Sequence, residues 1–131
     1  KFSIEFDVAS ALVAGDVGLA QLTDAFTNRP DMQALMAKVQ VHTTERPDPV
    51  DPAFSVADSV RITTRDGRVL ETGEIRFPKG HAMHPLSAAE LRSKFLDCVA
   101  YSGLPCDGMA LYERLRSLGQ MPDVRALAQH L

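Results

Sequence analysis

An Asp-Gly pair between two strand-like segments constrains the fold of this chain most strongly. Residues 58–65 alternate apolar and polar side chains, and Asp66-Gly67 follows them directly. This pair is typical of a tight type I′ hairpin turn, which needs positive φ at both central positions. The return strand is expected over about residues 68–77, with a bulge at Gly73. The middle of the chain is therefore predicted to be an antiparallel hairpin.

A third strand is expected just before this hairpin. Val39 and Val41 alternate with polar residues, which is the pattern of a strand. The intervening residues 46–52 contain three prolines and are predicted to form a loop. Residues 38–77 are therefore expected to form a three-stranded antiparallel unit.

Helical periodicity precedes this unit. Residues 3–14 are expected to form a helix that begins after Ser3 as N-cap and ends at Gly15. Two more helices are expected, one after Asp16 and one from Pro30, a residue favoured in the first helical turn. The buried stripe of the first helix is predicted to comprise Ile4, Val8, Ala11 and Leu12.

Helical periodicity also follows the unit. Ser87 and Glu90 have the spacing of a capping box, so a helix is expected from there to Gly103. Two shorter helices are expected after Asp107 and after Pro122. The buried stripe of the capped helix is predicted to comprise Leu91, Phe95 and Val99.

These elements predict a single α+β domain over residues 1–131. Residues 1–37 and 87–131 are helical, and residues 38–77 form the small antiparallel sheet. Helices are expected to pack on one face of that sheet, which gives two layers. Hydrophobic residues make up 45% of the chain and charged residues 24%, so a folded core is expected rather than disorder.

Charge and hydropathy exclude two kinds of partner. The net charge of -3 gives no broad attraction to nucleic acid or to an anionic membrane. No apolar run approaches the ~20 residues that span a bilayer. Cys98 and Cys106 are expected to be reduced thiols, which indicates a cytoplasmic protein. The chain opens at Lys1 without a methionine, and we expect it to be a piece of a larger protein.

Residues 77–85 stand out as a candidate site. This connection is long, and it contains Lys79, His81 and His84 around Gly80. Lys79, His81 and free backbone N–H groups near Gly80 can bind carboxylates or phosphate. The alternative interpretation is a solvated loop between two elements.

Other chemistries find little support in the sequence. His81 and His84 lack further ligands at a useful spacing for zinc, so no metal is expected. The chain contains no G-x-S-x-G, G-x-G-x-x-G or P-loop motif, and no cofactor is expected. Cys98 is predicted to be a small buried residue of a helix. Cys106 is predicted to be structural, although its place at a helix start would favour a thiolate.

Three stretches of the chain resemble the C-terminal part of the MmgE/PrpD family. That family includes 2-methylcitrate dehydratase, cis-aconitate decarboxylase and iminodisuccinate epimerase. The order and spacing of the stretches are similar to the family across nearly the whole chain. They are residues 1–6 with Val8, Ala9, Leu12 and Gly15, then residues 60–67, and finally residues 77–82 with 85–87 and 94–95.

The resemblance implies a fold and an activity. Members have a large helical domain and a smaller α+β lid, with the active site between them, and they are cofactor-free lyases and isomerases of small di- and tricarboxylates. This chain would be the C-terminal lid region of such an enzyme, a dehydratase of 2-methylcitrate-like acids. Its partners would be the carboxylate substrate, the N-terminal helical domain of the parent, and a second copy in a homodimer. Because the bases are expected in the helical domain, no catalytic residue is assigned within this chain.

Some residues carry over from the family, and two depart from it. Gly80-His81 matches a Gly-His pair of the family, so Lys79, Gly80 and His81 are the predicted substrate-binding residues. Phe2 and Phe6 stand where better-studied members have a histidine and a tyrosine. The lost tyrosine hydroxyl disfavours 2-methylcitrate dehydration itself and favours another branch of the family.

Two further alternatives stay open. Ser3 can supply a hydroxyl near Phe6, or it can act only as the cap of the first helix. The whole chain can also be a binding or oligomerisation domain without a catalytic role, in which apolar helix faces pack against a partner.

Overall fold

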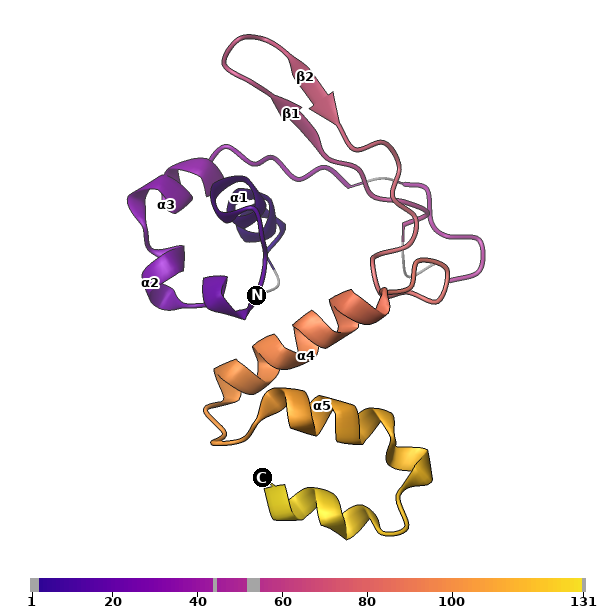
Figure 1. Cartoon of the computed structure of the whole chain (residues 1–131). Helices are drawn as coiled ribbons and strands as arrows, with labels where there is room; N and C mark the ends of the chain where they lie inside the picture. Colours follow the sequence, from indigo (N-terminus) through magenta and orange to yellow (C-terminus); the bar gives the residue numbers. More distant parts are fainter. Residues whose placement is uncertain (1–2, 44, 52–54, 131) are drawn as a thin grey trace. The chain divides into compact units, whose positions relative to one another are not determined.

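The computed structural model of the chain describes residues 3–43, 45–51 and 55–130, without the side chains of residues 128–130 (Figure 1). Contacts between Cα atoms divide the chain into two compact units. The helical unit comprises Lys1–Val41 and Ala88–Leu131, and the hairpin unit comprises His42–Ser87. No helix in the described part of the chain is long and apolar enough to cross a bilayer.

The first part of the helical unit consists of three α-helices and a 3-10 turn. The predicted caps of the first helix are confirmed: the Ser3 hydroxyl accepts the Phe6 N–H at 3.2 Å, and Gly15 has φ 73°. Pro30 occupies the first turn of its helix, as predicted. The elements are α1 (Ile4–Ala14), η1 (Leu19–Gln21), α2 (Asp24–Thr27) and α3 (Pro30–Met36).

The helix expected after Asp16 is interrupted. It becomes η1 and the short α2, because the Thr23 hydroxyl accepts the Phe26 N–H at 3.2 Å and begins a new helix there. Before η1, the Asp16 carbonyl accepts a hydrogen bond from the buried Ser10 hydroxyl at 2.8 Å. A side-chain cap therefore divides what the apolar spacing alone predicts as one helix.

The core of this part lies between α1, α2 and α3. Phe6, Ala9 and Met32 are buried, and the Phe6 ring meets the Phe26 ring edge-on at 6.4 Å. The predicted stripe of α1 is wrong, because Ile4 is 55% exposed and Leu12 is 49% exposed. Helix α1 is apolar on two faces, and the face that carries the larger Phe6 ring is the one that packs.

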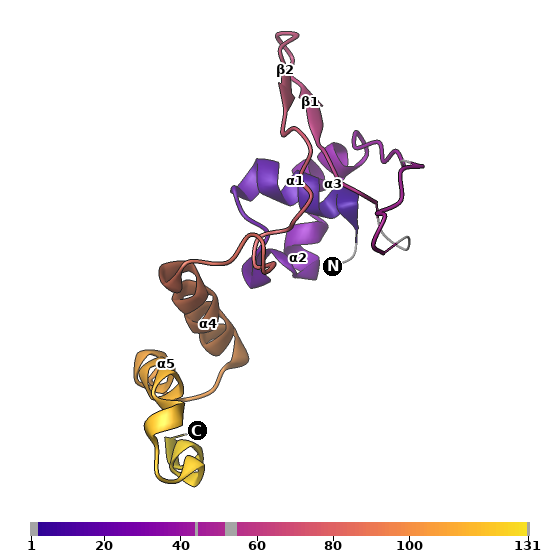
Figure 2. The same ribbon diagram turned by 90° about the vertical axis from the view of Figure 1, so that its right-hand side faces the viewer.

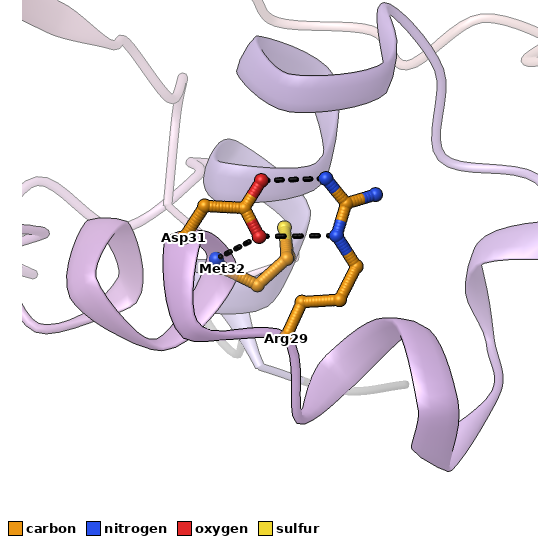
Figure 3. A network of polar contacts seen from close by, with 3 residues as sticks. All are labelled: Arg29, Asp31 and Met32. Atoms are coloured by element: carbon orange, nitrogen blue, oxygen red, sulfur yellow. Dashed lines mark hydrogen bonds and ion pairs between the residues drawn. The ribbon is translucent and has the colours of Figure 1, made fainter.

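A polar contact fixes the start of α3 (Figure 3). The Asp31 carboxylate accepts hydrogen bonds from Arg29 Nε at 3.0 Å and from the Met32 N–H at 3.0 Å. The Arg29 guanidinium lowers the pKa of Asp31, and the Met32 N–H adds a smaller effect in the same direction. Because the ion pair is exposed, we expect it to orient the first turn more than to stabilise the fold.

The second part of the helical unit is a pair of adjacent helices (Figures 1 and 2). The Phe95 and Tyr112 rings meet at 5.4 Å between them, and Tyr112 is 6% exposed. The predicted burial of Leu91 is wrong, because this residue is 52% exposed. The elements are α4 (Ala88–Ser102), α5 (Gly108–Arg116), η2 (Leu118–Gln120) and η3 (Val124–His130).

Asp107 caps α5, and its removal gives a testable loss of stability. Its carboxylate accepts the N–H groups of Met109 at 3.0 Å and Ala110 at 3.1 Å. We expect Asp107→Ala to lower the free energy of unfolding by about 1 kcal/mol, measured by urea denaturation. Asp107→Asn keeps an acceptor and should stay close to wild type. Equal losses in the two variants would contradict the capping role.

The hairpin unit contains the predicted antiparallel pair. Strand β1 (Arg61–Thr63) pairs with β2 (Val69–Glu71), and Ile62 stands opposite Leu70. The α+β class with a small antiparallel sheet is therefore confirmed.

The turn between the strands differs from the predicted type I′. Gly67 has φ 83°, but no described residue other than glycine has positive φ, so Asp66 does not. The Gly67 N–H donates to the Thr64 carbonyl at 3.0 Å, which closes a four-residue turn over residues 64–67. Glycine after such a turn is typical of a three-residue hairpin loop with a G1 bulge. An Asp-Gly pair is compatible with the two-residue type I′ loop and with the three-residue loop, and the three-residue loop forms here.

The bulge predicted at Gly73 is confirmed. The Thr72 N–H donates to the Val60 carbonyl, and the next paired residues are Asp58 and Ile75. Ser59 on the first strand side therefore faces two residues, Gly73 and Glu74, on the return side. Gly73 has φ 70°, as a bulge of this kind allows.

The strand expected near Val39 and Val41 is absent from the described residues 37–43. The N–H groups of Lys38 and Val39 bond back to Leu35 and Met36 at the end of α3. The sheet of the described residues has two strands, and an isolated bridge joins Pro47 to Ser55. The end of the helix therefore uses the backbone groups that strand pairing would need.

Candidate functional site

Residues 77–85, here called the histidine loop, are closed by their own backbone hydrogen bonds. The His81 N–H donates to the Pro78 carbonyl at 3.0 Å, and the His84 N–H donates to the His81 carbonyl at 2.8 Å. The Gly80 N–H reaches the His84 carbonyl at 2.8 Å. Two successive tight turns therefore make a compact unit out of a segment that is long in sequence.

Gly80 allows the first of these turns. It is the third residue of the turn over 78–81 and has φ 94°, which is the requirement of a type II turn. The backbone N–H groups of Gly80 and His81 are both used inside the loop. The expectation of free backbone N–H groups near Gly80 is therefore wrong for these two residues.

Replacing Gly80 should loosen the loop. A Cβ would lie 3.9 Å from Leu86 Cγ, an ordinary contact, so the cost of Gly80→Ala comes from the backbone. We expect about 1–2 kcal/mol, seen as faster hydrogen exchange of the His81 and His84 amides. Gly119→Ala is the matched control, because its added methyl group meets no atom within 4 Å and its φ is not positive. Unchanged exchange in Gly80→Ala would contradict this role of glycine.

Aromatic stacking orders the side chains of the loop. The Phe77 and His81 rings stack with centroids 4.7 Å apart and an interplanar angle of 17°. The Arg76 guanidinium carbon lies 5.4 Å from the Phe77 centroid. Such contacts restrict the rings to one arrangement and stabilise it modestly.

Asp48 connects this group to the preceding segment. Its carboxylate accepts the Val50 and Asp51 N–H groups at 2.8 and 3.2 Å and lies 3.4 Å from Arg76 Nη2. The Val50 and Asp51 amides hold the pKa of Asp48 below its ordinary value, and Arg76 adds to the effect. The lowered pKa favours the ionised carboxylate, which faces the Arg76 guanidinium.

Two exposed side chains of the loop, Lys79 and His81, carry hydrogen-bond donors. His81 Nδ1 accepts the Met83 N–H at 3.0 Å, whereas its Nε2 has no partner among the described residues. Lys79 is the neighbouring exposed side chain and carries an ammonium group. An ammonium group and an imidazole N–H both donate hydrogen bonds that carboxylate oxygens can accept.

The described residues show no metal site. No three histidine, cysteine or acidic side chains among them are grouped to hold an ion. Both cysteines are free thiols, and the predicted burial of Cys98 is wrong because this residue is exposed. Cys106 is half-buried just before α5.

A concave region lies in the helical unit, between α4 and α5. It is an open, largely apolar pocket of about 420 Å³. Among the described residues that line it, Arg116 carries the charge, and the Tyr112 hydroxyl donates to the Ala88 carbonyl at 3.5 Å. This pocket offers one cation on an apolar wall, which is a weaker match to a polycarboxylate than the histidine loop.

Comparison with known proteins identifies the class of domain. The family model of the MmgE/PrpD C-terminal domain matches residues 1–107, which is most of the chain. This chain therefore belongs to the MmgE/PrpD family, in its C-terminal domain. The comparison with curated proteins gave no match. The match includes the hairpin unit, the histidine loop and α4, and it ends just before α5.

The site residues predicted from the sequence have clear places in the structure. Lys79, Gly80 and His81 are consecutive in the first turn of the histidine loop, and their binding role stays a prediction. Phe6 is buried in the core against Phe26, and Phe2 lies outside the described residues. Sequence reasoning missed the part played by Phe77, because stacking across a tight turn leaves no periodic pattern.

Proposed function

We propose that this chain is the lid domain of an MmgE/PrpD-type enzyme. The enzyme is a lyase, a dehydratase that breaks a carbon–oxygen bond, or an isomerase of small di- or tricarboxylates such as 2-methylcitrate-like acids. One observation carries the proposal: a domain of this family presents Lys79 and His81 on a loop that its own hydrogen bonds hold closed.

The proposed reaction needs the kind of groups that this loop offers. Removing a proton next to a carboxylate places negative charge on the carboxylate oxygens, and cations and N–H donors stabilise that charge. In this proposal Lys79 supplies the cation and His81 the N–H donor, and both belong to the turn that the positive φ of Gly80 allows. The base that takes the proton belongs, in this proposal, to the helical domain of the enzyme. No cofactor is needed for such chemistry.

Exposed apolar side chains on α1 and α4 support the proposal that other protein surfaces pack against this chain. On α1, the face opposite the core exposes Ile4 and Leu12, and on α4 the side chain of Leu91 is exposed. Exposed large apolar side chains on helices are often covered at protein interfaces. We propose that the helical domain of the enzyme covers such surface, that the enzyme is a homodimer, and that it works in the cytoplasm.

Phe6 narrows the proposed reaction. Its ring is 4% exposed and packs on Phe26, so this position offers no hydroxyl to a substrate. The nearby Ser3 hydroxyl caps α1 and donates to Glu5 at 2.7 Å. We therefore propose a branch of the family that does not use a hydroxyl here, with a substrate other than 2-methylcitrate.

A panel of acids tests the function. The enzyme that contains this domain is incubated in D₂O with citrate-like and tartrate-like acids, and NMR follows proton exchange and elimination. We expect turnover of at least one acid by the enzyme and none by the present chain alone. Turnover by the chain alone would place the active site within it, and no turnover by either would contradict the family activity.

A further inference from the structure

The hydrogen bonds of the histidine loop define which nitrogen of His81 carries the proton. Nδ1 accepts the Met83 N–H at 3.0 Å, and only an unprotonated ring nitrogen can accept. In the neutral ring the proton is therefore on Nε2. Since Nε2 has no partner in the described part of the chain, its N–H is directed to a ligand or to water.

Phe77 holds the ring of His81 in this orientation. The two rings lie within 17° of parallel, which restricts rotation of the imidazole about its own bonds. The Phe77 carbonyl lies 3.3 Å from His84 Nδ1, and a carbonyl oxygen only accepts, so His84 Nδ1 carries the proton there. Phe77 thus contacts His81 through its ring and His84 through its backbone carbonyl. These are the first and last residues of the turn over residues 81–84.

From these contacts we propose that His81 acts as a hydrogen-bond donor through Nε2–H, that it does not act as a general base, and that Phe77 is its positioning residue. The donor role rests on the proposed function, whereas the assignment of the proton rests on the loop geometry alone. A base at this position would need an unprotonated nitrogen toward the substrate, and the only such nitrogen of neutral His81 already accepts the Met83 N–H.

The tautomers are measured directly. Long-range ¹H–¹⁵N NMR on the chain, at a pH where imidazole is neutral, distinguishes protonated from unprotonated ring nitrogens. We expect Nε2–H for His81 and Nδ1–H for His84. The Nδ1–H form of His84 is the stricter test of the loop geometry, because a free imidazole side chain favours Nε2–H. The Nδ1–H form at His81, or an average of both forms, would overturn the proposal.

A variant that removes only the Phe77 ring tests the positioning role. Phe77→Leu keeps the carbonyl that His84 contacts and loses the stack on His81. We expect the His81 nitrogen signals to move toward a tautomer average while those of His84 stay. Unchanged His81 signals would show that the Met83 amide alone fixes the ring and would overturn the role of Phe77.

Two substitutions of His81 separate a donor from a base. His81→Gln retains an N–H donor at a similar reach, whereas His81→Ala retains neither role. In the enzyme we expect kcat/KM within about tenfold of wild type for Gln and about a hundredfold lower for Ala. An equal loss in both variants would overturn the donor role and leave the site intact. Wild-type activity in both would instead contradict the proposed site.

Discussion

Met32→Ala lowers the free energy of unfolding of the helical unit by about 2–5 kcal/mol. Met32 is fully buried at 0% exposure, where it contacts Phe6 and Ala9 from α1. The substitution removes the apolar contacts of the long side chain and leaves a cavity between α1 and α3 that the helices close only in part. This is the largest expected loss of stability for a single side chain.

The measurement is urea denaturation followed by far-UV circular dichroism. Met109→Ala is the matched control, because the same atoms are removed from the same unit at a side chain that is 41% exposed. We expect the control to lose well under half as much stability. Equal losses in the two variants would mean that the core between α1 and α3 is not what holds this unit together.

His81→Ala lowers kcat/KM of the enzyme by about a hundredfold, the loss seen when one donor to developing charge is removed. The Nε2–H of His81 is held in place by the Met83 amide and the Phe77 ring, so no reorganisation is needed when charge develops. Stability should change little, since the side chain is exposed.

The matched control is His42→Ala, an exposed histidine of the same unit. It should keep wild-type kcat/KM on the same acid. If His81→Ala also keeps it, the histidine loop does not touch the reacting substrate, and the active groups must be sought elsewhere in the enzyme.

Local capping signals of the sequence predicted the helix ends well. Ser3, Gly15, Pro30 and Asp107 all occupy the positions that their chemistry favours. These features depend on hydrogen bonds within a few residues, which is why the sequence alone is sufficient. The Ser87–Glu90 capping box stays a prediction, although α4 begins at the residue after Ser87.

Burial was harder to predict than helix position. Helix α1 has apolar residues on two faces, so periodicity cannot decide between Ile4 and Phe6 as the core residue. The choice depends on α2 and α3, which supply Phe26 and Met32 as packing partners. The burial of Leu91 likewise depends on which elements pack against α4, and the periodicity of α4 alone does not show this.

The residue composition of the loop was sufficient to predict the candidate site, but it did not predict the hydrogen bonds that organise the loop. Lys79 and His81 stand out in the sequence as cationic groups in a long connection. The Met83 amide that fixes His81 and the internal use of the Gly80 N–H arise only when both turns close. Sequence spacing carries no information on hydrogen bonds of this kind.

The most direct test of the account is a titration of the ¹⁵N-labelled chain with citrate, followed by ¹H–¹⁵N NMR. Binding at the histidine loop predicts shifts concentrated at residues 78–84, and their loss in the double variant Lys79→Ala, His81→Ala. Shifts confined to the pocket between α4 and α5, or shifts that survive in the double variant, would contradict a carboxylate site at this loop.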